Sequence, residues 1–129
     1  MTRPPADILA AVALGGTIGS LARYGITVAW PSPYAIGFIN VVGCAAIGAL
    51  LQTLADLPSS HRAHRLARPF VGTGILGGFT TFSTYAVQNI TWIRDGQPLT
   101  AASYLIGTLV LALAATAAGA ALARRWDRP

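Results

Sequence analysis

Four long apolar segments, separated by short polar connections, make up most of the chain. They run over about residues 7–30, 34–55, 69–93 and 99–123 of a total of 129. Each is long enough to cross the roughly 30 Å hydrocarbon core of a bilayer as a helix that rises about 1.5 Å per residue. The pattern predicts a single all-α membrane domain, residues 1–129, with four transmembrane helices.

Proline and glycine mark the predicted turns between these segments. Pro31 and Pro33 follow the first segment, and proline cannot continue a helix. The residues RDGQP at 94–98 separate the last two segments, and a longer polar connection, about residues 56–68, precedes the third. The chain is expected to cross the membrane four times, with both termini on the same side.

The third segment contains an interruption. Its stretch 72–85, GTGILGGFTTFSTY, is uncharged, yet it places Gly77-Gly78 next to Thr80-Thr81. We expect the third helix to be broken there in mid-membrane, which is tolerated only where the backbone is buried in protein or lines a water-filled cavity. Freed carbonyls at this depth can bind a cation, and hydroxyl and amide hydrogens can bind an anion. The stretch therefore predicts an ion site.

Composition supports a membrane protein and argues against nucleic-acid binding. Hydrophobic residues make up 53% of the chain and charged residues only 10%. The net charge of +5 comes from arginine alone, because the chain has no Lys and no Glu. The arginines gather at segment ends instead of forming a stripe with aromatic residues, so a nucleic-acid partner is not expected. Cys44, the single cysteine, is interpreted as a buried, reduced thiol.

The distribution of arginine predicts the orientation of the chain. Only Arg94 lies on the side of the membrane opposite the termini. By the positive-inside rule, both termini are predicted to be cytoplasmic. The arginines predicted on the cytoplasmic side number seven: Arg3, Arg62, Arg65, Arg68, Arg124, Arg125 and Arg128.

Two polar side chains lie well inside predicted helices. Arg23 should face protein or water, since a guanidinium near the bilayer centre costs about 2.5 to 3.5 kcal/mol. It either extends to the nearer interface or forms an electropositive vestibule that attracts anions. Asn40 carries amide donors and an acceptor, and either joins two helices or contributes to an ion path.

Aromatic residues accompany the predicted break. Phe82 stands beside the hydroxyl side chains of Ser83 and Thr84. Because an aromatic ring has a positive edge, it can stabilise an anion where water is absent. This spacing suits a narrow anion path, although aromatic residues at helical spacing also serve as core packing. The aromatic set is Phe79, Phe82, Tyr85 and Tyr104.

Three motifs together resemble one known family. They are GGTIGSLARY at 15–24, NVVGCAAIG at 40–48 and GILGGFTTFST at 74–84. In sequence and in spacing they are similar to the signatures of the CrcB or Fluc fluoride channels, which are small four-helix proteins. The resemblance covers essentially the whole chain, and the TTFST core beside a glycine pair is its most specific part.

The resemblance implies an antiparallel dimer in a bacterial plasma membrane. Such a dimer conducts fluoride passively through two pores, exports it from the cytoplasm and so relieves its toxicity. A structural sodium ion, which is not transported, is implied at the dimer centre. The backbone carbonyls of Gly77 and Thr80 would bind it, two from each chain.

The resemblance also implies roles along the fluoride pathway. Phe82 would present a ring edge to fluoride, Asn40 would donate its amide, and Arg23 would line the vestibule. Position 85 is Tyr where the family usually has a second Phe, so a hydroxyl is added that could bind fluoride, bind water or narrow the path. Further residues that match pore-lining positions are Ser83, Thr84, Tyr104 and Thr108.

The arginine bias leaves the composition of the dimer open. A chain that pairs with its own inverted copy should insert in both orientations and have nearly balanced charge, whereas this one is biased seven to one. The partner is therefore either a second copy or an inverted paralogue. The alternatives are a non-conducting or partner-requiring subunit and, less favoured, a small multidrug-type exporter, which would need a carboxylate inside the membrane. An enzyme is not expected, because no His, Lys or carboxylate within the spans could activate a hydroxyl.

Overall fold

The structure is a computed structural model that describes residues 5–55 and 62–126. Its elements, in chain order, are α1 (Ala6–Ala29), α2 (Ala35–Ala55), α3 (Arg62–Ala67), the π-helix η1 (Arg68–Leu76), α4 (Gly77–Phe79), α5 (Phe82–Arg94) and α6 (Pro98–Trp126). Every regular element within the described residues is helical, which confirms the predicted all-α class. The predictions for Arg3, Arg128 and residues 56–61 lie outside the described part of the chain.

Three helices, α1, α2 and α6, are long and apolar enough to cross a membrane. They leave many large apolar side chains exposed, among them Leu14, Leu21 and Leu113, each more than 60% exposed. Such surfaces are stable in contact with lipid. The predicted third span falls on the shorter elements η1, α4 and α5, none of which is long enough to cross a bilayer alone, while α3 lies in the predicted polar connection before it.

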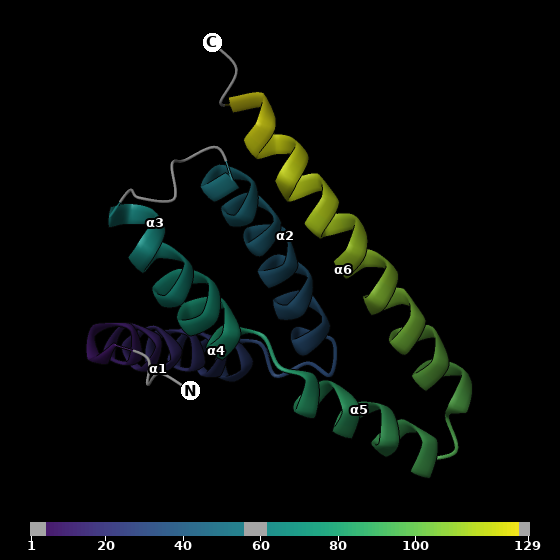
Figure 1. Cartoon of the computed structure of the whole chain (residues 1–129). Helices are drawn as coiled ribbons and strands as arrows, with labels where there is room; N and C mark the ends of the chain where they lie inside the picture. Colours follow the sequence, from purple (N-terminus) through teal and green to yellow (C-terminus); the bar gives the residue numbers. More distant parts are fainter. Residues whose placement is uncertain (1–4, 56–61, 127–129) are drawn as a thin grey trace.

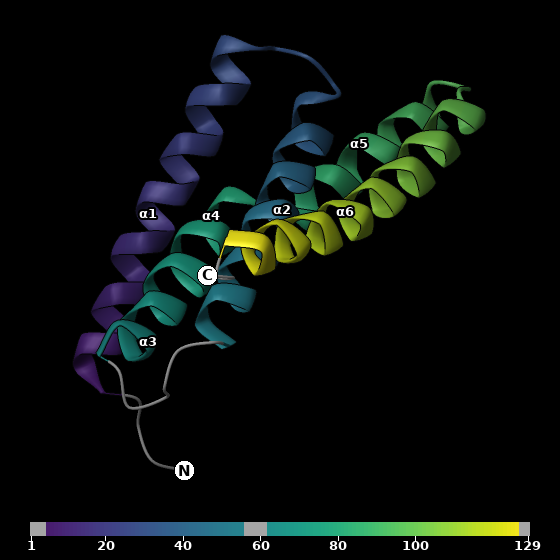
Figure 2. The same cartoon turned by 90° about the horizontal axis from the view of Figure 1, so that it is seen from above.

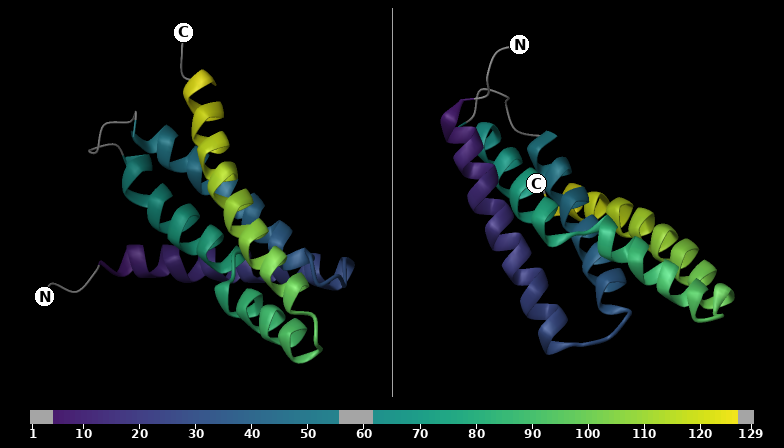
Figure 3. Two further views of the ribbon diagram at one scale, coloured as in Figure 1. Left: turned by 90° about the vertical axis from the view of Figure 1, so that its right-hand side faces the viewer. Right: turned by 90° about the horizontal axis from the view of Figure 1, so that it is seen from below.

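The helices form two groups that meet at the centre of the molecule. α2 and α6 lie side by side, and α5 runs beside the first half of α6 (Figures 1 and 3). α1 packs on η1 and α4 (Figure 2). Figure 1 shows α4 joined to α5 by a short extended link near the place where the two groups meet.

Glycine allows close approach in both groups. A Cβ at Gly48 would overlap the carbonyl oxygen of Thr116, and a Cβ at Gly119 would overlap that of Ala45, so α2 and α6 touch along their backbones. On α1, a Cβ at Gly15 would lie 2.9 Å from the Cα of Gly74 in η1. Small residues are typical of helix contacts in membranes, where packing replaces the hydrophobic driving force.

The turns form as their sequences predict. α1 ends at Ala29, just before the Pro31–Pro33 turn. After α5, Gly96 takes a left-handed conformation with φ of 72°, which glycine adopts without strain. The amide of Gly96 donates to the Ile93 carbonyl (3.2 Å), and that of Gln97 donates to the Trp92 carbonyl (2.8 Å). These two bonds make a Schellman cap that ends the helix and reverses the chain.

Two polar contacts each join one helix end to another helix. Asp7 at the start of α1 forms an ion pair with Arg65 in α3. Arg124 near the end of α6 donates to Gln52 near the end of α2 at 3.1 Å. Arg65 therefore lies beside the start of α1, Arg124 lies beside the end of α2, and Arg94 ends α5 beside the turn into α6.

We expect Gly48→Ala to destabilise the protein, because its methyl group must push α2 away from α6. Overpacking of this kind costs about 1 to 3 kcal/mol. Thermal unfolding of the purified protein in detergent should show a lower midpoint temperature. Gly25→Ala in α1 is the matched control, since its Cβ would meet nothing within 4 Å. An unchanged midpoint for Gly48→Ala would contradict the close contact between α2 and α6.

Candidate functional site

The helical backbone is interrupted at Thr80 and Thr81. α4 ends at Phe79, and the next two residues are extended, with φ and ψ of −79° and 158° at Thr80 and −150° and 128° at Thr81. α5 begins at Phe82. The Thr80 amide and hydroxyl both still donate to the Leu76 carbonyl, at 3.0 and 2.8 Å. Because the helix stops here, the last carbonyls of α4 have no amide donors within the helix and need donors from elsewhere.

Asn40 of α2 supplies partners for the backbone of Thr81. Its Nδ2 donates to the Thr81 carbonyl at 3.0 Å, and its Oδ1 accepts from the Thr81 amide at 2.9 Å. One side chain thus satisfies both backbone polar groups of an extended residue. One of the two Nδ2 hydrogens is used in this way, and the other remains for a further acceptor.

Arg23 and Ser20 of α1 supply partners on the other side of the break. Arg23 Nε donates to the Gly78 carbonyl at 3.2 Å, and the Ser20 hydroxyl lies 3.4 Å from the same oxygen. In a continuous helix this oxygen would accept from the amide of residue 82. A positive charge at the carboxyl end of a helical segment is also favourable to the helix dipole. Arg23 is half-buried, so it lies against protein.

The start of α5 is capped from within the break. The Thr81 hydroxyl accepts from the Thr84 amide at 3.3 Å and lies 3.2 and 3.3 Å from the hydroxyls of Ser83 and Thr84. Ser83 and Thr84 are exposed on the surface of the single chain. The free amide groups at the start of a helix, together with hydroxyl donors, make a surface that favours an anion.

A hollow of about 280 Å³ opens beside the break, between α2, α5 and α6. Asn40, Phe82 and Thr108 contribute to its wall, and a second hollow of about 390 Å³ shares Thr108 and includes Tyr104. Both hollows lie against α2 and α6, and Thr108 is the residue that they share. The complete lining of the first is Asn40, Cys44, Thr80, Thr81, Phe82, Tyr85, Thr108, Leu109 and Ala112.

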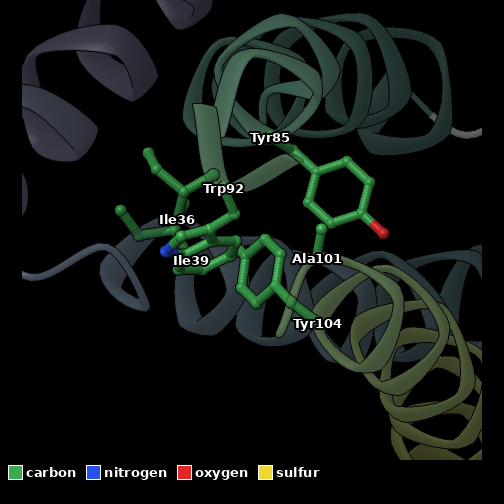
Figure 4. Close-up of a cluster of buried hydrophobic side chains, with 6 residues drawn as sticks. All are labelled: Ile36, Ile39, Tyr85, Trp92, Ala101 and Tyr104. Carbon is green, nitrogen blue, oxygen red and sulfur yellow. The ribbon is translucent and has the colours of Figure 1, made fainter. Parts of the chain in front are cut away.

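Aromatic rings connect the break to the buried core. Phe82, which is 79% exposed, lies 6.0 Å from Tyr85 between ring centroids, and Tyr85 lies 5.3 Å from Tyr104. Tyr104 in turn meets Trp92 at 4.9 Å in an edge-to-face arrangement, and Figure 4 shows the two rings together in the core. Phe82 is thus the exposed end of a packed series of rings.

The Tyr85 hydroxyl has a partner inside the protein. It donates to the Leu105 carbonyl of α6 at 2.7 Å, and Figure 4 shows it pointing away from Ile36 and Trp92. This bond ties α5 to α6. The sequence suggested that this hydroxyl binds fluoride, binds water or narrows the path. The contact that the structure shows is a different one, a hydrogen bond between two helices.

The structure groups the predicted site residues in three places. Around the hollows it brings together Asn40, Phe82, Tyr85, Tyr104 and Thr108. At the start of α5 it places Ser83 and Thr84, which line neither hollow.

Arg23 and Gly77 belong to the third place, the end of α4, and Thr80 belongs both to it and to the first hollow. Arg23 lines neither hollow and instead contacts the Gly78 carbonyl. Within the described part of the chain, no hydrogen bond from another element reaches the carbonyl oxygen of Gly77 or Thr80. Both oxygens are therefore candidates for binding a cation.

Three residues near the site were missed or misjudged from the sequence. Thr81 stood inside a recognised motif, but its role as helix cap and as partner of Asn40 was not foreseen. Ser20 was not assigned a role at the site, although its hydroxyl lies 3.4 Å from the Gly78 carbonyl. The interpretation of Cys44 as a buried thiol was wrong, since it is half-buried and lines the hollow. Its position one turn after Asn40 on α2 was the available signal.

Side-chain metal ligands do not gather anywhere in the described residues. Within 5–55 and 62–126, no three of His, Cys, Asp and Glu lie together as a metal site would require. Any cation held at the break would therefore depend on neutral oxygens, those of the backbone or of hydroxyl and amide side chains.

Comparison with known proteins shows similarity to one family model and to several fluoride-specific ion channels. The family model described as "CrcB-like protein, Camphor Resistance (CrcB)" matches residues 10–120. "Fluoride-specific ion channel FluC 2" of Streptomyces avermitilis is 50% identical over 109 residues, which cover 81% of this chain and 67% of the relative. "Fluoride-specific ion channel FluC 1" of Streptomyces coelicolor is 46% identical over 129 residues, covering 95% and 81%. The Nocardia farcinica protein "Fluoride-specific ion channel FluC 2" is 45% identical, covering 94% and 89%.

We expect Arg23→Ala to destabilise the protein, because the Gly78 carbonyl keeps only the longer contact with Ser20. Loss of a hydrogen bond from a charged donor costs about 1 to 3 kcal/mol, and this one is partly buried. The measurement is the midpoint temperature of thermal unfolding in detergent, with Arg94→Ala at the exposed end of α5 as control. Arg23→Lys, which keeps one charged donor, should fall between the wild type and Arg23→Ala. Equal midpoints for Arg23→Ala and the wild type would show that Arg23 does not stabilise the break.

Proposed function

The chain belongs to the CrcB-like family of fluoride-specific ion channels, and on that premise we propose that fluoride crosses the membrane beside the break at Thr80 and Thr81. The protein is a multi-pass membrane channel and not an enzyme. The observation that carries the proposal is the hollow lined by Asn40, Phe82 and Thr108 next to a helix start. Fluoride holds its water tightly, so a selective path must replace that water with fixed donors.

The donors along the proposed path follow from the geometry. Phe82 offers an exposed ring edge at the break, and Ser83 and Thr84 offer hydroxyls at the start of α5. The path continues past Thr108 towards Tyr104 along α6. Arg23, which faces the end of α4, adds positive potential that attracts anions towards the site.

Transport along this path is passive. Hydrogen fluoride is a weak acid that enters cells as the neutral molecule and ionises inside. A selective channel then lets the negative-inside membrane potential drive the anion outward. Export by this route protects the cell from fluoride without an energy source, and the proposed location is a bacterial plasma membrane.

We propose that η1, α4 and α5 together make a third, interrupted membrane span. α1, α2 and α6 are then the first, second and fourth spans. By the positive-inside rule, we propose that Arg65 in α3 and Arg124 and Arg125 at the end of α6 lie on the cytoplasmic side. Both termini are proposed to lie on that side, with Arg94 on the other.

A sodium ion at the break is a further part of the proposal. The carbonyl oxygens of Gly77 and Thr80 lie at the end of α4, where helical partners run out, and neutral oxygens suit a hard cation. Two such oxygens from each of two chains would make a four-oxygen site. When bound, the ion supplies a fixed positive charge that holds these carbonyl ends together, and it is not transported.

A second chain is needed to enclose the path. Phe82, Ser83 and Thr84 are all exposed on the single chain, so one wall of the route past them is open. We propose an antiparallel dimer embedded in lipid, in which the partner closes that wall. Because seven arginines are predicted on one side of the membrane and one on the other, the dimer is either a homodimer or a pair with an inverted paralogue.

The test is fluoride efflux from liposomes that contain only this purified chain. A potassium gradient with valinomycin sets the voltage, and fluoride and chloride electrodes follow the two anions. We expect rapid fluoride loss without chloride loss, which would show that a homodimer suffices. Phe82→Ala is the matched inactive control, because truncating an exposed ring should remove most of the flux without loss of folded protein.

Two results would change the proposal. Equal loss of chloride and fluoride would contradict a fluoride-selective path. No fluoride loss from well-folded protein would favour the alternative of a non-conducting or partner-requiring subunit, and adding the inverted partner should then restore flux. A small multidrug-type exporter stays disfavoured, because the chain has no Glu and its Asp residues lie near the ends of the spans.

A further inference from the structure

We propose that Asn40 is a positioning residue, which fixes the backbone of Thr81 and through it the start of α5 and the direction of Phe82. This inference rests on the proposed path beside the break, and it gives Asn40 a role other than that of a fluoride ligand. The evidence is the pair of hydrogen bonds between residues 41 positions apart, at 3.0 and 2.9 Å.

The Asn40 side chain contacts the Thr81 backbone as a neighbouring strand would in a sheet. Thr81 is extended and follows the end of α4, so its amide has no acceptor within a helix, whereas its carbonyl, as that of the N-cap, already faces α5. In a sheet a neighbouring strand would contact both groups, and here the Asn40 side chain does so, by accepting from the Thr81 amide and donating to the Thr81 carbonyl. An unpaired backbone group at this depth would cost several kcal/mol, because no lipid group can replace the partner.

Asparagine is specifically suited to this task. Its terminal amide holds a donor and an acceptor side by side, as a peptide group does. An ionised aspartate has only acceptors and would repel the Thr81 carbonyl, and alanine has neither group. The half-buried position of Asn40 on α2 places the amide at the break without a long flexible side chain.

The position of Thr81 in turn fixes the start of α5, which contributes to the proposed pathway. Its hydroxyl caps α5 by accepting from the Thr84 amide at 3.3 Å. Phe82 follows directly and begins the helix, with its ring 79% exposed. A shift of Thr81 would therefore move the cap, the hydroxyls of the first turn and the proposed ring edge together.

Hydrogen exchange tests the positioning role without any reference to conduction. In Asn40→Ala, amide exchange in peptic fragments that cover Thr81 and Thr84 should be at least about tenfold faster than in the wild type, because both amides lose support. Fragments from α6 should be unchanged. Thr53→Ala is the matched control on α2, since the Thr53 hydroxyl bonds only within its own helix, to the Ala49 carbonyl. Wild-type exchange at Thr81 in Asn40→Ala would overturn the proposal, whatever the chain conducts.

Rescue by acid separates positioning from direct ligation of fluoride. A protonated carboxyl has one O–H donor and one carbonyl acceptor, enough for both Thr81 bonds but with no hydrogen left for fluoride. Asn40→Asp should therefore exchange fast and conduct poorly at neutral pH. At acidic pH both properties should return towards the wild type measured at the same pH, after subtraction of leak from protein-free liposomes.

One result of the rescue experiment would contradict the inference. If acid restores slow exchange at Thr81 in Asn40→Asp while fluoride flux stays lost, the missing second amide hydrogen is what conduction requires. Asn40 would then be a fluoride ligand and not a positioning residue.

Discussion

The absence of water in the membrane interior is the constraint on which this structure depends. A helix that stops at Phe79 and restarts at Phe82 leaves backbone groups that lipid cannot satisfy. Side chains from two other helices meet this need, with Asn40 on Thr81 and Arg23 on Gly78. Arg23 and Asn40 would be costly inside a membrane without partners, and the irregular backbone supplies those partners. The interruption and its polar partners stabilise each other.

Much of the fold follows from the sequence because it depends on local chemistry. Apolar runs of sufficient length predict membrane helices, and Pro31 and Gly96 mark turns through their own backbone preferences. The π-helix from Arg68 to Leu76 was not predicted, because apolar periodicity does not distinguish it from an α-helix. It contains Pro69, which lacks an amide hydrogen, and Gly74, which lies against Gly15 of α1.

The candidate site was predictable in its residues but not in its pairings. The sequence identified Arg23 and Asn40 as candidates, because polar side chains are costly inside a membrane unless they have partners. Their partners are 55 and 41 residues away and depend on how α1 and α2 pack on the break, which no local pattern encodes. The same holds for the Tyr85 hydroxyl, whose acceptor is the Leu105 carbonyl of a neighbouring helix.

The central claim, that fluoride passes beside the break, is tested most directly through Cys44. This residue is the single cysteine of the chain, and it lines the hollow with Asn40 and Phe82. A small water-soluble methanethiosulfonate reagent is applied to the reconstituted native protein while fluoride efflux is followed. The account predicts that modification stops the flux, and that Cys44→Ser protein is unaffected by the reagent. Complete modification of Cys44 with unchanged fluoride flux would contradict it.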